Sequence, residues 1–585
     1  MDQLPTEFDV IIVGTGIVES VVSAAASRVG KRVLHIDRSD YYGGQWASFS
    51  LESISKLHEE QIERKNIINS SHIEHSGISE FVELGNKLFD IKNIECTWHV
   101  QSKTDTEQSK ESTEMNDSDL IQNLVPNEEQ HTQETVTWTK EALLKESRKF
   151  NIDLVPKLQY ARGDFVELLI SSNIARYSEF RSVSRVLTWL NEHLEVVPCS
   201  RSDVFSNNKV SVIEKRMLMK LLTSLEDVEK DLSGCKDKTY HNYLKEKKLT
   251  PNLIHYVLYA ISMSDNNTLC EQGIKQTRRF LGSLGRFGKT PFLFSMYGSG
   301  EMPQAFCRLS AVFGGIYALG QPMKGLTISE NKFKCLLVND QKLTAEHLVL
   351  NLEHAPKQFV DLKKLEYISR CVLITDRSVM SSEKEHLTLL LYPPENDKNS
   401  VIMIELGTLT GTCPKDLYLV HMTTRQKTNP KEDFLHIINN IFNINHKDTE
   451  SEKPKVLWVC YFSLPDFLSS DVKQNVPDNV FLGTGPDIDS DYDFSVKQAK
   501  EIFSKMYPEE EFLPRAPDPE EIVIEAEDEE IEDKDMADKQ TDQKDEATDG
   551  EVKQKAETKD TETKQKAKTQ DTETLENVEK KQVDH

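Results

Sequence analysis

The sequence lacks most of the features of a secreted, metal-binding or nucleic-acid-binding protein. Its nine cysteines are an odd number and form no C-x-x-C pair, so neither a disulfide framework nor a zinc site is indicated. The net charge of −26 argues against a basic surface for nucleic acid or for an anionic membrane. A reduced, cytosolic compartment fits this composition best.

Long hydrophobic runs are also missing. No apolar run approaches the roughly 20 residues that span a bilayer, and the chain begins with a strand pattern instead of a signal peptide. The last residues, KKQVDH, are not a prenylation box. Residues 521–585 contain no aromatic side chain and carry 23 acidic and 11 basic residues. We therefore expect residues 516–585 to form a disordered acidic tail.

The first forty residues carry the pattern of a βαβ unit. An apolar run at 8–13 predicts a strand buried on both faces, Gly14 and Gly16 predict a turn, and a helix and a second strand at 31–37 follow. This pattern favours an α/β fold, with α+β as the alternative. Further strands are expected at 347–351, 371–376, 387–392, 401–406, 417–423 and 456–462.

Two regions depart from the α/β pattern. Residues 57–147 are polar and lack apolar periodicity, so we expect an insertion that is partly disordered. Residues 158–288 repeat apolar side chains at helical spacing, which predicts a smaller, all-helical domain. Residues 1–157 and 289–515 would then form the larger domain.

The turn at Gly14 departs from the dinucleotide-binding fingerprint G-x-G-x-x-G. Glu19 stands where the third glycine is expected, although Asp37 follows Gly14 by 23 positions, where an acid would bind the ribose. A carboxylate about 4 Å from a phosphate charge costs ~4 kcal/mol at an effective dielectric of 20. We expect Glu19 to occupy the anion position with its own negative charge, which predicts no cofactor. The alternative is a Glu19 that points to solvent and leaves a distorted, usable site.

Two long segments resemble the signatures of the GDP-dissociation-inhibitor superfamily. They are RVLHIDRSDYYGGQWAS at 32–48, which follows DVIIVGTGIVES, and FGKTPFLFSMYGSGEMPQAFCRLSAVFGGIYAL at 287–319. Shorter segments, among them VPCSRSDVF and EKRMLMK, are similar to the Rab escort protein branch, as is the long insertion. The resemblance covers most of residues 1–56 and 148–525, and it implies a flavoprotein-like FAD/NAD(P)-binding fold without the cofactor.

The resemblance to the escort branch also implies a function. Such a protein does no chemistry itself: it binds newly made, GDP-bound Rab GTPases, presents their C-terminal cysteines to Rab geranylgeranyltransferase, and carries the prenylated Rab to a membrane. Each isoprenoid chain brings on the order of 10 kcal/mol of hydrophobic free energy, so the product needs an apolar groove. Two alternatives stay open, namely a Rab GDP-dissociation inhibitor that recycles prenylated Rabs and a flavin-dependent oxidoreductase.

The family's Rab-binding residues match three positions of this chain. They are Tyr42, Glu301 and Arg308, and the last two lie seven positions apart, so they face the same way on a helix. A solvated ion pair is the alternative for these two. Ile316 and Ala318 are candidates for the same platform or, equally, for core positions of a strand.

Phe205 matches a phenylalanine that docks into the transferase α subunit in the escort branch. Val212 is a candidate for the same patch, and the alternative for Phe205 is a hydrophobic staple onto the following helix. Leu218, Leu221 and Leu222 are candidates for contact with the lipid, with ordinary packing in a helical bundle as the alternative. The sequence suggests no metal site and no nucleophile–base pair.

Overall fold

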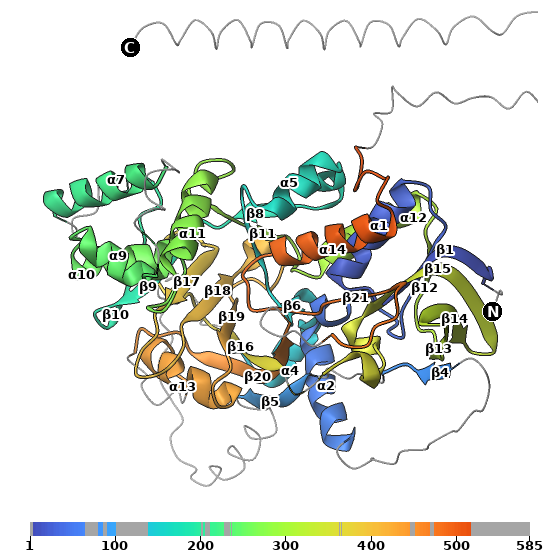
Figure 1. The fold of residues 1–585 in the computed structure, drawn as a ribbon. Helices are drawn as coiled ribbons and strands as arrows, with labels where there is room; N and C mark the ends of the chain where they lie inside the picture. Colours follow the sequence, from blue (N-terminus) through green and yellow to red (C-terminus); the bar gives the residue numbers. More distant parts are fainter. Residues whose placement is uncertain are drawn as a thin grey trace, which may run out of the picture. The chain divides into compact units, whose positions relative to one another are not determined.

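The computed structural model describes residues 4–64, 80–85, 91–100, 138–200, 203–204, 211–226, 235, 237–361, 363, 365–444, 451–467 and 473–515. The described residues belong to one compact unit that ends at Pro517, and Figure 1 shows its strands and helices. The predicted acidic tail lies outside the described residues, and so does most of the predicted insertion.

The first sheet is built around the predicted βαβ unit. β1 (Glu7–Val13) pairs in parallel with β2 (Val33–Ile36) on one side and with β15 (Gln341–Asn351) on the other. The strand order is β12-β2-β1-β15-β14-β13-β4, and β21 also pairs with β15. The other strands of this sheet are β4 (Glu80–Glu83), β12 (Ile316–Ala318), β13 (Met323–Ser329), β14 (Lys332–Val338) and β21 (Val480–Gly483).

Three helices pack on this part of the molecule: α1 (Ile17–Arg28), α12 (Glu301–Val312) and α14 (Asp493–Met506). α1 contacts both α12 and α14, and the three helices lie side by side in Figure 1. A seam of small side chains joins α1 to α12: the Oγ atoms of Ser23 and Ser27 each lie 2.8 Å from the Oγ of Ser310. Small side chains permit this close approach, so α12 is fixed to the βαβ unit.

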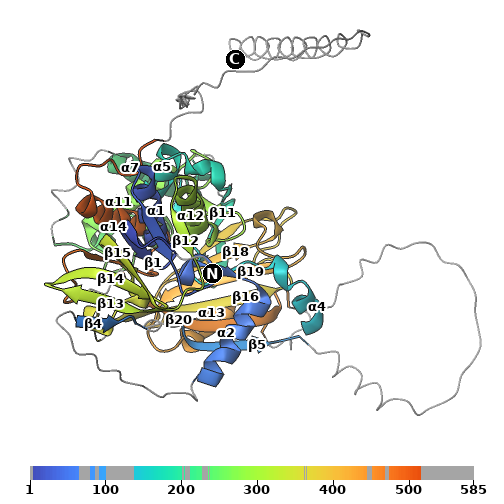
Figure 2. The same ribbon diagram turned by 90° about the vertical axis from the view of Figure 1, so that its right-hand side faces the viewer.

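The second sheet has the order β10-β9-β17-β18-β19-β16-β20-β5. β9 and β17 are parallel, and all other neighbours are antiparallel. Figure 2 shows α13 (Pro430–Ile441) beside this sheet, where it contacts β16 and β20. The strands are β5 (Lys92–Trp98), β9 (Arg185–Leu190), β10 (His193–Val196), β16 (Glu366–Thr375), β17 (Thr388–Tyr392), β18 (Val401–Leu406), β19 (Tyr418–Arg425) and β20 (Val456–Asp466).

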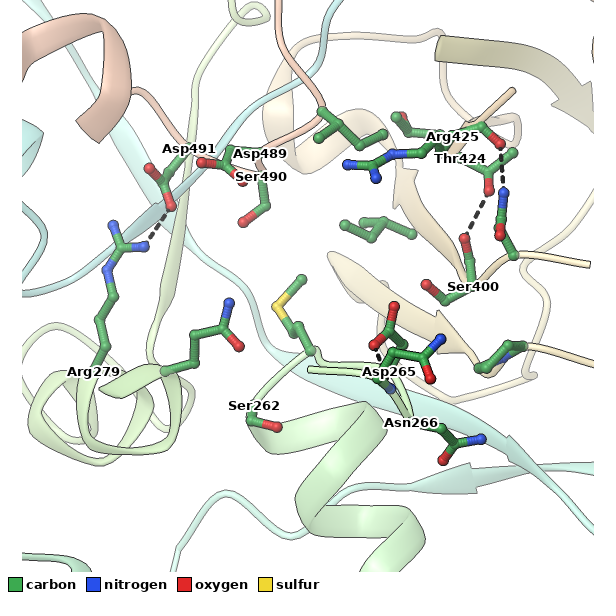
Figure 3. A pocket seen from close by; sticks show the side chains of 18 of the residues that line it. Ser262, Asp265, Asn266, Arg279, Ser400, Thr424, Arg425, Asp489, Ser490 and Asp491 are labelled. Atoms are coloured by element: carbon green, nitrogen blue, oxygen red, sulfur yellow. Dashed lines mark hydrogen bonds and ion pairs between the residues drawn. The ribbon is translucent and has the colours of Figure 1, made fainter. Parts of the chain in front are cut away.

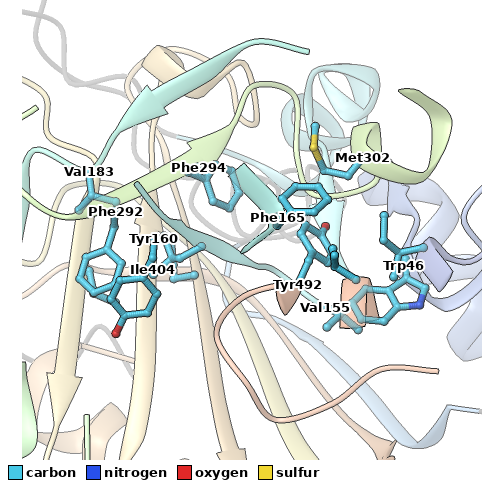
Figure 4. Close-up of a cluster of buried hydrophobic side chains, with 14 of the residues drawn as sticks. Trp46, Val155, Tyr160, Phe165, Val183, Phe292, Phe294, Met302, Ile404 and Tyr492 are labelled. Atoms are coloured by element: carbon cyan, nitrogen blue, oxygen red, sulfur yellow. The ribbon is translucent and has the colours of Figure 1, made fainter. Parts of the chain in front are cut away.

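An aromatic core joins distant parts of the chain. Figure 4 shows Trp46, Phe165 and Tyr492 packed together; the ring of Tyr492 lies 5.6 Å from that of Trp46 and 4.8 Å from that of Phe165. Two small sheets flank this region, β7-β11-β8 and β3-β6. Their strands are β3 (Ser48–Phe49), β6 (Ile152–Asp153), β7 (Leu158–Tyr160), β8 (Phe180–Ser182) and β11 (Phe292–Ser295).

The predicted strands are all present, but the prediction of an all-helical domain at 158–288 is wrong for its first part. β7, β8, β9 and β10 fall inside this range, and β9 joins the second sheet through β17. These strands are short, so an alternation of apolar and polar residues is not visible in the sequence. The helices of this range are α5 (Asp164–Ser171), α7 (Val212–Glu226), α9 (Tyr240–Glu246), α10 (Pro251–His255) and α11 (Cys270–Ser283), with a π-helical turn at Tyr256–Ile261.

The predicted insertion also contains ordered elements. α2 (Leu51–Arg64) runs into it, α4 (Lys140–Lys145) closes it, and β4 and β5 lie within it. β4 pairs with β13, and β5 pairs with β20, so both strands sit at sheet edges. Strands of antiparallel sheets can leave one face in water, which explains why the polar composition of this region concealed them. Among the described helices, none combines the length and apolarity of a transmembrane span.

Candidate functional site

Glu19 fills the hollow in front of the glycine turn. Its side chain is fully buried, so the alternative of a solvent-facing Glu19 is wrong. A Cβ atom at Gly16 would lie 2.5 Å from one carboxyl oxygen, and a Cβ atom at Gly483, the last residue of β21, would clash with the other. The two glycines therefore make room for the Glu19 carboxyl in front of the turn. The residues at this turn do not fit a dinucleotide.

The charge that we expected on Glu19 is a further correction. Burial raises the pKa of Glu19 to about 8, so the carboxyl is mostly protonated at neutral pH. Asn351 and the backbone N–H of Glu19 lie near enough to favour the charged form. Neither they nor any other described group makes a hydrogen bond of good geometry with its oxygens. Glu19 thus fills the space in front of the turn with its side chain, and its carboxyl is largely uncharged.

Asp37, at the position of the ribose-binding acid, is engaged inside the protein. Its Oδ2 accepts hydrogen bonds from the backbone N–H and the hydroxyl of Thr15, at 2.8 and 2.7 Å, and its Oδ1 accepts one from Ser39 N–H. The His354 imidazole, whose Nε2 lies 3.6 Å from Oδ1, and the hydrogen bonds donated by Ser39 and Thr15 hold the pKa of this carboxyl below its ordinary value despite burial. Asp37 is therefore a structural carboxylate of the turn.

The same threonine connects the turn to Tyr42. The Thr15 hydroxyl, which donates to Asp37, accepts a hydrogen bond of 3.0 Å from the backbone N–H of Gly43. Gly43 and Gly44 have φ values of +95° and +52°, which L side chains rarely adopt. These values define a tight turn immediately after Tyr42. The turn that carries Tyr42 is thus held by Thr15 and Asp37, residues of the glycine-turn motif.

A second chain of contacts reaches Tyr42 through His35. Nε2 of His35 lies 2.6 Å from the Gly14 carbonyl, and its Nδ1 lies 3.1 Å from the Tyr317 hydroxyl. Burial lowers the pKa of His35 to about 4, so the ring is neutral at physiological pH and donates to Gly14 while accepting from Tyr317. The Tyr317 ring meets Tyr42 edge-on at 5.9 Å. Sequence reasoning did not find this support, because it depends on β12 lying beside β2.

The outer face of α12 lies beside Tyr42. Glu301 is its half-buried first residue, Arg308 is exposed, and Gln304 between them lines the same surface hollow as Tyr42. Burial raises the pKa of Glu301, and the charge of Arg308 opposes this rise. Val312 continues the face and is 63% exposed. The structure thus places Tyr42, Glu301 and Arg308 around one surface, and the helical spacing 301, 304, 308, 312 could have added Gln304 and Val312.

The two candidates on β12 differ from each other. Ile316, at the edge of the first sheet, is 36% exposed. Ala318 is buried and packs in a core with Leu34 and Ile36, so its expected place on the platform surface is wrong and the core alternative holds. Both residues pair with β2, Ile316 with Leu34 and Ala318 with Ile36, and only Ile316, the first residue of β12, remains at the surface.

The hollow next to Tyr42 has a volume of about 510 Å³. Tyr41, Phe49 and Lys56 line it together with Tyr42 and Gln304. Two aromatic rings, Tyr41 and Phe49, meet edge-on at 5.4 Å. The surface around Tyr42 therefore combines an amide and a cationic group with aromatic side chains, which are enriched at protein-binding surfaces.

The candidates for transferase and lipid contact lie on or near α7. Phe205 lies outside the described residues. Val212 and its neighbour Ile213 begin α7 and are 65% and 71% exposed, an unusual state for two adjacent β-branched residues. Leu218 and Leu221 are buried in the main core and Leu222 packs against it, so helical packing, not an open groove, describes them.

A second cavity, of about 440 Å³, lies between the helical region and the second sheet (Figure 3). Its walls are polar: Arg279 and Asp491 form an ion pair of 2.8 Å on one side, Arg425 lies on the other, and Asp265 lies on the helical side. Among the described residues, no cluster of His, Cys, Asp or Glu side chains has the arrangement of a metal site.

Comparisons with known proteins identify the family of this chain. Residues 1–91 match the family model for GDP dissociation inhibitor, and residues 368–488 match that for RAE1/2 domain I, C-terminal region. The human Rab proteins geranylgeranyltransferase component A 1 is 35% identical over 89% of this chain and 94% of its own length. The chain belongs to the Rab escort protein family.

Other relatives place the chain within this family. The Drosophila melanogaster Rab proteins geranylgeranyltransferase component A is 34% identical over 90% of this chain and 94% of its own length. A Rab GDP-dissociation inhibitor of Saccharomyces cerevisiae is more distant, at 24% identity over 72% of the chain and 81% of its own length. The crystal structure of a Rab GDI from Plasmodium falciparum shares the fold, with a TM-score of 0.59 and 17% identity over 87% of this chain and 100% of that one. The predicted flavoprotein-like, GDI-type fold is confirmed.

Proposed function

We propose that this chain is a Rab escort protein that binds newly made, GDP-bound Rab GTPases, presents them to Rab geranylgeranyltransferase, and delivers the prenylated Rab to membranes. The proposal rests on membership of the family and on one structural observation: the residues of a nucleotide site are used internally to fix Tyr42 beside the outer face of α12. In this proposal the chain catalyses no step, and it works in the cytosol with transient membrane contact.

The Rab-binding surface in this proposal consists of Tyr42, Glu301, Arg308 and Ile316, to which we add Gln304 because it lines the hollow beside Tyr42. An aromatic ring and an arginine held on rigid elements are the groups that most often dominate the free energy of protein association. Because Tyr42 is held through Thr15 and Tyr317, little conformational entropy is lost when a partner binds.

The start of α7 is the proposed contact with the transferase. Val212 and Ile213 expose two adjacent apolar side chains, and Phe205, outside the described residues, precedes them in sequence. An apolar pair at a helix start supports docking to a complementary groove. The lipid site stays open, because the described leucines of α7 are packed against the helical core.

One reconstitution tests the proposal against its alternatives. Purified chain is mixed with an unprenylated Rab, the transferase and labelled geranylgeranyl diphosphate, and lipid transfer is followed. We expect transfer to depend on the chain. A GDP-dissociation inhibitor would bind prenylated Rab without supporting transfer, and a flavin-dependent oxidoreductase would do neither and would be yellow.

Matched variants locate the two surfaces. Tyr42→Ala should weaken Rab binding on the order of 30-fold, the size of a ~2 kcal/mol hot spot, whereas Lys497→Ala, an exposed cation on α14, should have no effect. Phe205→Ala and Ile213→Asp should retain Rab binding and lose transferase binding. Wild-type transfer by Tyr42→Ala would overturn the assignment of the Rab surface, and wild-type transfer by Ile213→Asp that of the transferase surface.

A further inference from the structure

Two cysteines that are 35 positions apart meet in the helical region. Cys235 precedes α9, and Cys270 is the first residue of α11. Their Sγ atoms lie 2.7 Å apart. A disulfide bond measures about 2.0 Å, so a displacement of less than ~1 Å separates this contact from a covalent bond. We propose that Cys235 and Cys270 form a redox-active thiol pair that small disulfides of the glutathione type convert reversibly into an intramolecular disulfide.

Both cysteines are buried, and two positively polarised groups lie beside them. Cys270 stands at the N-terminus of a helix of 14 residues, whose partial positive charge stabilises an anion there. The ammonium group of Lys238, which forms an ion pair of 2.8 Å with Glu246, also lies within electrostatic reach of both sulfurs. The carbonyl of Lys238 also accepts a 3.0 Å hydrogen bond from the N–H of Cys270, which fixes the segment after Cys235 against the helix start. The helix N-terminus and the Lys238 ammonium therefore lie beside the same pair of sulfur atoms.

A second pair of cysteines is also close together but has different surroundings. Cys96 and Cys460 face each other on β5 and β20, with their Sγ atoms 3.0 Å apart. Burial in the sheet and the neighbouring Cys96 raise the pKa of the Cys460 thiol well above its ordinary value. Neither residue lies at a helix N-terminus. Cys235, Cys270 and Cys460 are all buried, so the helix N-terminus and Lys238 are what distinguish the first pair. We therefore expect the second pair to stay reduced where the first is oxidised.

The reaction is a thiol–disulfide exchange in two steps. One protein thiolate attacks a sulfur of glutathione disulfide; a protein–glutathione disulfide forms and one glutathione thiolate leaves. The second protein thiolate then attacks the protein sulfur of that mixed disulfide and expels the second glutathione. Two cysteine thiols are oxidised, glutathione disulfide is reduced to two glutathione molecules, and the two thiol protons end on the glutathione produced.

The bond would close a loop that contains α9, α10 and the π-helical turn. The same loop supplies Met263, Asp265 and Asn266 to the wall of the cavity in Figure 3. Closing a loop of this length removes conformational freedom from the unfolded chain and stabilises the native helical region. The inference does not depend on Rab binding, so it stands or fails separately from the proposed function.

The test incubates the full chain with buffers of increasing oxidised-to-reduced glutathione ratio. Intact-mass spectrometry and peptide mapping without reductant then follow the cysteines. We expect the loss of two hydrogen atoms and one cross-linked peptide pair that contains Cys235 and Cys270, reversed by dithiothreitol. The midpoint of thermal unfolding should rise by several degrees on oxidation.

Variants separate this pair from the other cysteines. Cys270→Ser and Cys235→Ser should abolish the cross-link, and Cys96→Ser should leave it unchanged. The mass measurement on the unmutated chain stands even where a serine variant fails to fold. Absence of the cross-link at the most oxidising ratio, a persistent single glutathione adduct, or a cross-link confined to Cys96 and Cys460 would each overturn the proposal.

Discussion

The glycine turn and the outer face of α12 lie close together but use their polar groups in opposite ways. At the turn, Glu19 is buried, the Thr15 hydroxyl donates to Asp37, and the Gly43 N–H donates to Thr15. On α12, Arg308 and Val312 point outward. One region is closed on itself and the other is open to a partner. The comparison shows how a nucleotide-binding fold becomes a support for a protein-binding surface.

Substitutions should therefore divide into those that change stability and those that change binding. The largest loss of stability is expected for Lys157→Met, at a buried position beside Trp46. The Lys157 ammonium is fully buried, 2.5 Å from Asp487 Oδ1, and lies over the Trp46 ring. Removing one partner of a buried ion pair costs about 3–5 kcal/mol. Urea unfolding measures it, with Lys334→Met on the exposed surface of β14 as the control; equal midpoints would contradict it.

Glu19→Gln should change how stability depends on pH. The folded pKa of about 8 exceeds the ordinary 4.5, so above pH 4.5 the folded state holds a proton that the unfolded state has lost. Wild-type stability therefore falls as pH rises from about 5 to 8, on the order of 2–4 kcal/mol from this group.

The glutamine variant should lack this contribution and be the more stable protein at pH 8. Urea titrations at pH 5 and pH 8 measure the difference, with Glu7→Gln, an exposed residue at the start of β1, as the control. Parallel pH profiles of wild type and Glu19→Gln would show that the Glu19 carboxyl is ionised in the fold.

Thr15→Val tests the connection between the two regions. The substitution removes the hydroxyl that donates to Asp37 and accepts from Gly43, and unpartnered buried groups cost about 1–3 kcal/mol. We expect lower stability and, because the Tyr42 turn loosens, weaker Rab binding in titration calorimetry. A loss of stability with unchanged affinity would show that the turn does not support the platform.

Arg308→Ala should have the smallest effect on stability and a clear effect on binding. Arg308 is exposed, and surface substitutions usually change stability by within about 0.5 kcal/mol. Rab affinity should fall about tenfold, as expected for ~1.4 kcal/mol at an interface. An unchanged affinity would place the Rab surface elsewhere and contradict the proposed difference between the glycine turn and the outer face of α12.

The sequence was most informative where the local pattern alone determines the structure. The strand at residues 8–13 was predictable because its side chains are buried on both faces, and Tyr42 followed from the family signature. The state of Glu19 was not predictable, since its burial depends on Gly483, more than 450 positions away. The strands before Val197 were missed because they are short and pair with β11 and β17.

The closure of the glycine turn also has a consequence for how the protein matures. A fold completed by a diffusible cofactor gains stability in proportion to the logarithm of that cofactor's concentration. Here the hollow in front of the glycine turn is filled by Glu19, which is part of the polypeptide and is present throughout folding. This part of the native state is therefore supplied by translation alone, whatever small molecules the cell contains.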